Sequence, residues 1–154
     1  MLILVLVLSM FSLAVAGLFT WQVLQKDTGT PAMRAISDAI KEGAEAFLRR
    51  QNKTIFVLAM VTAALIFFLT AYAKNDPAEG MRTALSFLFG AFCSGLAGVI
   101  GMFVSIRTNI RTASAARRSL NEALQTALRG GAVSGLTVVA MSLLGVGGLF
   151  VVMG

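Results

Sequence analysis

Residues 54–73 read TIFVLAMVTAALIFFLTAYA and contain no charged side chain. A helix rises about 1.5 Å per residue, so about 20 such residues cross the roughly 30 Å hydrocarbon core of a bilayer. Three further stretches, 2–25, 83–106 and 130–154, are also free of Asp, Glu, Lys and Arg. Backbone amides in lipid must bond within their own segment, and no period-two alternation indicates barrel strands. The sequence therefore predicts an all-α polytopic membrane protein with four transmembrane helices.

Composition supports lipid as the solvent. The 154 residues are 57% hydrophobic and 13% charged, whereas soluble domains are about 25% charged. The chain has no His, which removes the commonest general base and metal ligand. A single cysteine, Cys93, excludes a disulfide framework, and its apolar setting favours packing over reactivity. A disulfide-stapled secreted module, a zinc finger and a disordered chain are thereby excluded.

The basic residues alternate between the two sides of the membrane. Six of them lie in residues 26–53, two in the short turn 74–82, and five in residues 107–129. Cytoplasmic loops carry the excess of Lys and Arg. We therefore expect 26–53 and 107–129 to face the cytoplasm and the N-terminus to lie outside. Topology accounts for the net charge of +6, so no nucleic-acid partner is expected.

The first apolar stretch has one alternative interpretation. Ala14-Val15-Ala16 has the small-x-small form of a signal-peptide cleavage site. However, no Lys or Arg precedes the apolar run, which continues to Leu24 and contains Trp21 near its end. Trp at that place is typical of the headgroup level. We expect a retained membrane anchor.

Both cytoplasmic loops are predicted to be helical. Thr30-Pro31 is a helix start, with Thr as N-cap and Pro at the first helical position. Apolar and charged residues then alternate at helical spacing, and we expect this helix to run into the second span. Residues 113–128 repeat Ala and Leu at the same spacing, which predicts a second amphipathic helix that continues the third span and leads to the fourth. Its alanine-rich face suits a neighbouring helix.

The charged side chains of the first loop allow two interpretations. Asp38, Glu42 and Glu45 offer carboxylate oxygens of the kind that Mg²⁺ prefers. The stronger interpretation is a pair of ordinary i,i+4 ion pairs, Lys41–Glu45 and Glu45–Arg49. No metal site is assigned to these residues.

Arginines of the second loop are open to two interpretations as well. Arg107, Arg111 and Arg118 match the geometry of a phosphate ligand. More often such arginines contact anionic lipid headgroups and fix the topology. Arg129-Gly130-Gly131 lacks the lysine and Ser/Thr of a phosphate loop, so packing explains it better.

Small residues predict where the spans pack. Ser86, Gly90, Ser94 and Gly98 recur every four residues in the third span, and Gly131 with Gly135 forms a GxxxG step in the fourth. Such ridges let helix backbones approach closely in membranes. The bulky second span is expected to face lipid.

The four stretches lack the groups that transport and catalysis require. Pumps and proton relays need ionisable side chains at membrane depth, and no histidine is present to activate a serine. The chain alone is therefore expected neither to carry protons nor to catalyse by a nucleophilic serine.

Three segments resemble one family. IKEGAEAFLRRQ (residues 40–51), followed by Thr54-Ile55, resembles the loop that leads into the second helix of membrane-bound, ion-translocating pyrophosphatases. Gly101-Met102 with RTNIRTA (107–113), and RGGAVSG (129–135), resemble the third and fourth helices of that family. The likeness covers roughly 32–154. Asn52 stands where an aromatic is common, and Thr108 where alanine is common.

The resemblance implies more than the residues show. It implies a homodimer of many-helix subunits in a prokaryotic plasma membrane. Such an enzyme hydrolyses Mg²⁺-pyrophosphate at the cytoplasmic face and drives H⁺ or Na⁺ outward, with K⁺ as a possible cofactor. The catalytic signature of that family follows its fifth helix and is absent here, so no catalytic, cofactor-binding or metal-binding residue is assigned. We expect 1–154 to be a single membrane domain, the N-terminal portion of such a pump, inactive alone. The alternative is a complete four-helix scaffold or assembly subunit without enzymatic activity.

Overall fold

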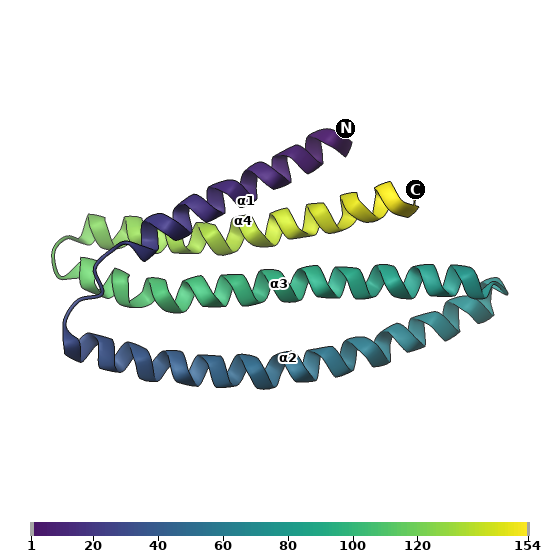
Figure 1. Cartoon of the computed structure of the whole chain (residues 1–154), viewed down its shortest axis with the longest axis horizontal. Helices are drawn as coiled ribbons and strands as arrows, with labels where there is room; N and C mark the ends of the chain where they lie inside the picture. The colour runs from purple at the N-terminus through teal and green to yellow at the C-terminus, as the bar shows by residue number, and fades with distance from the viewer. Residues whose placement is uncertain (1, 154) are drawn as a thin grey trace.

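Four long helices make up the computed structural model, which describes residues 2–153 (Figure 1). They are α1 (Leu2–Leu24), α2 (Pro31–Lys74), α3 (Pro77–Ala116) and α4 (Leu120–Met153). Each is long and apolar enough to cross a membrane. The described residues contain no strand. The predicted all-α fold with four membrane-spanning helices is confirmed.

Helix ends follow the local chemistry of the sequence. Thr30 is the N-cap of α2, where its Oγ1 accepts a hydrogen bond from Met33 N at 3.3 Å, and Pro31 follows as predicted. Asp76 caps α3 in the same way, accepting from Ala78 N at 2.8 Å. Asn75 ends α2 with φ 51°, a left-handed conformation that asparagine tolerates. The turn between α2 and α3 is therefore tight.

The helix predicted to start at Thr30-Pro31 is confirmed, and the one predicted for 113–128 is corrected. α2 runs without interruption through 44 residues, so the amphipathic segment and the second span form one helix. The single helix predicted for 113–128 is wrong, because a turn at 117–119 divides it between α3 and α4. There the amide groups of Arg118 and Ser119 both bond to Ala115 O, at 2.9 and 3.0 Å, which closes the turn. Alanines on both sides of it, Ala115 and Ala123, are buried as the alanine-rich pattern suggested.

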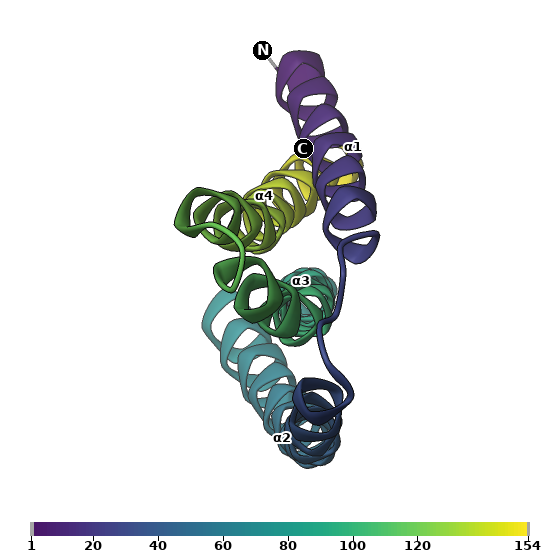
Figure 2. The same ribbon diagram turned by 90° about the vertical axis from the view of Figure 1, so that its left-hand side faces the viewer.

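The helices pack as a row rather than as a closed bundle. α1 packs on α4, α4 on α3, and α3 on α2, while α1 and α2 lie far apart (Figure 2). The core is small, centred on Ala16, Val104 and Val133. Large apolar side chains such as Phe56 and Leu69 remain 65% and 69% exposed. Such exposure is what lipid or further protein as the surroundings would require.

Close helix contacts fall on other glycines than those of the predicted ridges. A Cβ atom on Gly90, Gly98 or Gly131 would meet nothing within 4 Å. Between α3 and α4, close approaches occur instead at Gly101, near Ser134, and at Gly130, near Thr108. One residue turns a helix face by about 100°, because a turn holds 3.6 residues. The small-residue pattern therefore indicated that α3 and α4 pack together, but it did not identify the glycines that make the close contacts.

Candidate functional site

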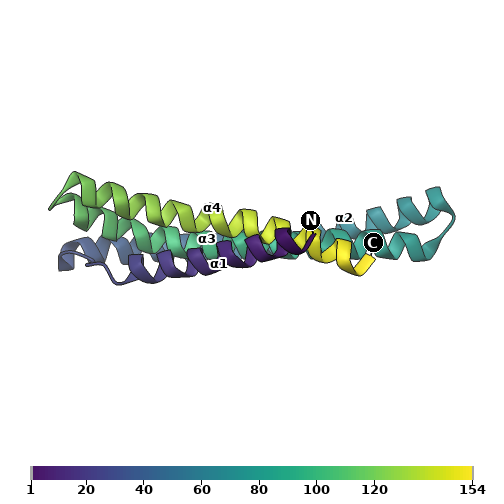
Figure 3. The ribbon, with the colours of Figure 1, turned by 90° about the horizontal axis from the view of Figure 1, so that it is seen from above.

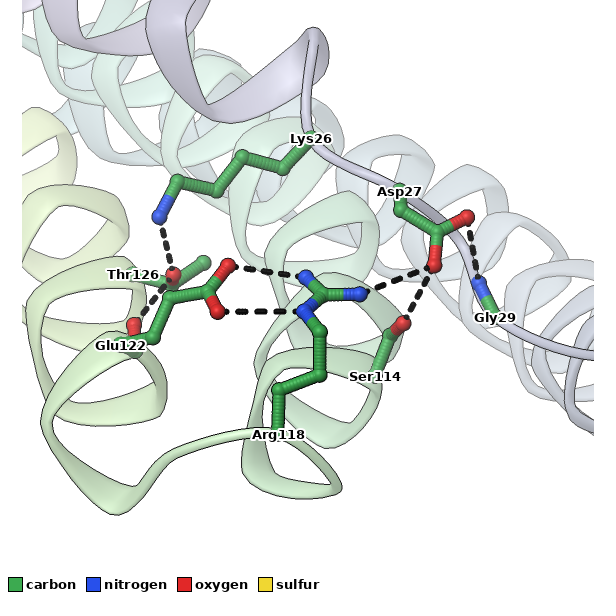
Figure 4. Close-up of polar contacts among 7 residues, drawn as sticks. All are labelled: Lys26, Asp27, Gly29, Ser114, Arg118, Glu122 and Thr126. Atoms are coloured by element: carbon green, nitrogen blue, oxygen red, sulfur yellow. Dashed lines mark hydrogen bonds and ion pairs between the residues drawn. The ribbon is translucent and has the colours of Figure 1, made fainter.

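A polar cluster joins the two links at one end of the molecule (Figure 4). The link between α1 and α2 lies against the turn between α3 and α4, and side chains from both meet. Seven residues take part: Lys26, Asp27, Gly29, Ser114, Arg118, Glu122 and Thr126. They come from α1's end, α3, α4 and both connections. The cluster thus ties together segments that are distant in sequence.

Arg118 is the centre of the cluster. Its Nε and Nη2 donate to the two carboxylate oxygens of Glu122 at 3.1 and 2.8 Å, a bidentate pair. Its Nη1 reaches Asp27 Oδ2 at 3.2 Å. Asp27 also accepts from Ser114 Oγ at 2.9 Å and from Gly29 N at 3.1 Å. One guanidinium therefore bridges α4 and the α1–α2 link.

A second tie runs from the end of α1 to α4. Lys26 Nζ donates to Thr126 Oγ1 at 2.8 Å, and that hydroxyl donates to Glu122 O at 2.7 Å. Thr126 is fully buried. Both basic residues of the cluster thus have protein partners.

Arg111 holds the C-terminus of α1. Its Nη2 donates to Leu24 O at 2.9 Å and its Nη1 to Arg107 O at 2.7 Å. A cation favours the C-terminal end of a helix, where carbonyl groups lack partners. Arg107 lies over the Phe103 ring at 3.4 Å from its centroid. The three arginines that could have bound a phosphate therefore have partners within the chain: Arg111 contacts α1, Arg107 contacts Phe103, and Arg118 contacts two carboxylates.

The charges of the cluster stabilise one another. Hydrogen bonds from Ser114 and Gly29, and then the cation of Arg118, lower the pKa of Asp27 below its ordinary value of 3.8. The bond from Arg118 lowers the pKa of Glu122, and Glu122 in turn raises the pKa of Arg118. Burial lowers the pKa of Arg111, with a smaller effect from Arg107. All four groups keep their charge near neutral pH.

The acidic residues of α2 do not converge. Among residues 2–153 no three His, Cys, Asp or Glu side chains lie close enough to hold a metal ion. Lys41 Nζ and Glu45 Oε1 are 3.9 Å apart, as predicted, but the described residues show no Glu45–Arg49 pair. The first ion pair is confirmed and the second is wrong.

Sequence reasoning missed most of the cluster. Asp27 and Ser114 are 87 residues apart, and Lys26 and Thr126 are 100 residues apart, so local spacing in the sequence predicts neither contact. Only Arg118–Glu122, at i,i+4, carried a signal that could have been used. The cluster fastens the fold: the carboxylate that accepts from the Ser114 hydroxyl, Asp27, is also bound by Arg118.

Four spanning helices, exposed apolar side chains and a polar cluster at the connections define an integral membrane protein of the polytopic α-helical class. The profile of the family described as "Inorganic H+ pyrophosphatase" matches residues 10–154, and the chain belongs to that family.

Curated relatives agree with this assignment. The chain is 49% identical over 143 residues to "K(+)-insensitive pyrophosphate-energized proton pump 2" of Moorella thermoacetica, covering 93% of this chain and 20% of that protein. It is 48% identical to "K(+)-insensitive pyrophosphate-energized proton pump" of Caldanaerobacter subterraneus, over 93% of this chain and 21% of that protein. It is 44% identical to "Pyrophosphate-energized membrane proton pump 3" of Arabidopsis thaliana, covering 95% and 20%. The chain thus spans about a fifth of the length of these relatives.

Proposed function

We propose that the chain is the N-terminal portion of a membrane pump that couples hydrolysis of inorganic pyrophosphate to outward transport of H⁺. The match of the family profile to residues 10–154 carries this proposal. Relatives whose matches cover 93–95% of this chain are named pyrophosphate-energized proton pumps, which favours H⁺ over Na⁺. Two of them are named K(+)-insensitive, so we expect activity without added K⁺.

Within that pump, the four helices act as a membrane-embedded shell around catalytic segments. The described residues do not fit a Mg²⁺ site, because their carboxylates are dispersed along α2 or paired with arginine and lysine. The Mg²⁺ ions that such a pump needs would be held by other segments of the polypeptide. The contribution of this chain is anchoring: exposed apolar faces for lipid and protein neighbours, and a polar cluster that fixes α1 to the rest.

The proposed pump is a homodimer in a prokaryotic plasma membrane. The distribution of Lys and Arg supports an orientation with the N-terminus outside and residues 26–53 and 107–129 in the cytoplasm. In that orientation the polar cluster lies on the cytoplasmic side, where pyrophosphate is hydrolysed.

Two preparations test the proposal. The complete polypeptide that contains this chain, reconstituted into vesicles, is expected to hydrolyse Mg²⁺-pyrophosphate and to acidify the vesicle lumen without K⁺. The 154-residue chain alone is expected to do neither. Turnover by the short chain would overturn the shell role, and an inactive complete polypeptide would overturn the pump.

The gene itself separates the pump from the scaffold alternative. Beyond the codon for Gly154, an open frame that encodes a fifth apolar segment and then an acidic signature supports the pump. A stop codon at that place supports a four-helix scaffold.

A further inference from the structure

Two grooves flank the contact between α2 and α3. The helices touch near their turn, where a Cβ on Gly80 would lie 2.8 Å from Phe67 O, and they separate further along (Figure 1). The separation leaves grooves of about 550 and 430 Å³, one on each side of the pair. Six residues line both: Asn52, Ile55, Ala59, Ala91, Gly95 and Val99.

The two grooves differ in their walls. The smaller one, here the Phe56 groove, is completed by Phe56, Met60, Leu88, Phe92 and Leu96. The larger one, here the Gln51 groove, includes Gln51, Thr62 and Ser94. The Phe56 groove therefore has bulky apolar walls, with Asn52 as its only polar lining residue.

Unpaired cations stand at one end of the Phe56 groove. Arg49 and Lys53 precede Phe56 by seven and three residues, so they lie on the same face of α2. Both are exposed, and neither has a side-chain partner within residues 2–153. Glu45, one turn before Arg49, is already paired with Lys41. Leu48 and Gln51, at the corresponding end of the Gln51 groove, are uncharged.

These cations lie deeper than those of the other helices. Arg111 contacts the end of α1, and Gly130 contacts Thr108, so the first charged residues of α1, α3 and α4 lie near one level. Lys53 adjoins Asn52, which shares its groove with Val99. Val99 is eight residues before Arg107, roughly 12 Å further along α3 toward its turn with α2, at 1.5 Å per residue. At the other end of the molecule, the α2–α3 hairpin extends past the ends of α1 and α4 (Figure 3).

We propose that the Phe56 groove binds an anionic phospholipid, with an acyl chain between Phe56 and Phe92 and the phosphate at Arg49 and Lys53. Lys53 directly precedes the uncharged stretch 54–73, which is the level of the lipid headgroups, and basic pockets between helices bind anionic headgroups. A phospholipid supplies the negative charge and the apolar tail at the required level together. This lipid site requires only that the chain spans a membrane, so the proposal does not depend on the proposed pump function.

The first test removes the cations. In the complete polypeptide that carries this chain, purified in detergent, Arg49→Gln with Lys53→Gln is compared with Arg34→Gln with Arg129→Gln, two cations that line neither groove. Native mass spectrometry measures bound phosphatidylglycerol in competition with phosphatidylcholine. Each cation near an anionic headgroup is worth about fivefold in affinity, so Arg49→Gln with Lys53→Gln is expected to lower phosphatidylglycerol binding roughly 25-fold. The control pair is expected to leave binding within about twofold. Equal binding in both pairs overturns the proposal.

The second test fills the groove and leaves the charges in place. Gly95→Leu places a side chain into the Phe56 groove, whereas Gly90→Leu places one into a different groove, between α3 and α4. Both positions have room for a Cβ, and unchanged melting temperatures check that both variants fold. Phosphatidylglycerol binding is lost only in Gly95→Leu. Equal binding in the two variants, or a carbodiimide cross-link from Lys53 to a carboxylate of another protein segment, would show that lipid is not the occupant.

Discussion

Gly130 of α4 packs directly against Thr108 of α3: a Cβ atom on Gly130 would lie 2.6 Å from Thr108 Oγ1. Thr108 is 5% exposed and its hydroxyl donates to Val104 O at 2.8 Å, so it has no room to rotate away freely. This contact sets how closely α3 and α4 approach at the end that carries the polar cluster. Gly131, the next residue, faces open space.

Gly130→Ala is therefore expected to destabilise the fold, and Gly131→Ala is its matched control. Overpacking costs about 1–3 kcal/mol, while both variants gain the helix propensity of alanine, about 1 kcal/mol. Thermal unfolding in detergent measures the difference. Adding Thr108→Ala to Gly130→Ala removes the two nearest atoms, leaves Cβ of residue 108 at 2.9 Å, and is expected to restore part of the lost stability. A Gly130→Ala variant as stable as Gly131→Ala would show that the helices separate there without cost.

Arg118 is expected to immobilise the α1–α2 link through its bridge to Asp27. A spin label on Thr28→Cys, in a Cys93→Ala background, reports the motion of that link. Arg118→Gln removes the bridge, so the mobile component of the spectrum becomes dominant. Arg129→Gln removes an unpaired cation at the same end and leaves the spectrum unchanged. Identical spectra for the two variants would contradict a fastening role.

Low pH is expected to release the same link. Hydrogen bonds from Ser114 and Gly29 and the charge of Arg118 hold the pKa of Asp27 below 3.8. A carboxylate whose pKa is lower in the folded than in the unfolded chain stabilises the fold at any pH above the unfolded-state pKa. This stabilisation is lost as the pH falls through the folded-state pKa. The spin-label spectrum should thus be constant from pH 7 to 5 and become mobile below 3.8. In Asp27→Asn the link should already be mobile at pH 7, with a smaller further change.

The helices could be predicted from sequence because their signals are local. Thr30-Pro31 and Asn75-Asp76-Pro77 mark ends within a few residues, and uncharged stretches mark the spans. Relations between helices could not be predicted. Whether Gly130 or Gly131 meets α3 depends on a rotation of about 100° per residue, which composition does not fix. The Asp27–Ser114 bond likewise depends on packing between segments 87 residues apart.

The last prediction concerns the orientation of the chain in the membrane, and the structure indicates which positions to substitute with cysteine for labelling. Residue 115 lies on the expected cytoplasmic side, but Ala115 is fully buried and would resist a reagent whatever its side. Ser119, in the turn between α3 and α4, and Ala78, at the start of α3, are both exposed. In a Cys93→Ala background, a membrane-impermeant maleimide applied to intact cells should label Ala78→Cys and spare Ser119→Cys. After lysis both are labelled. Labelling of Ser119→Cys alone in intact cells would invert the orientation and place the polar cluster outside.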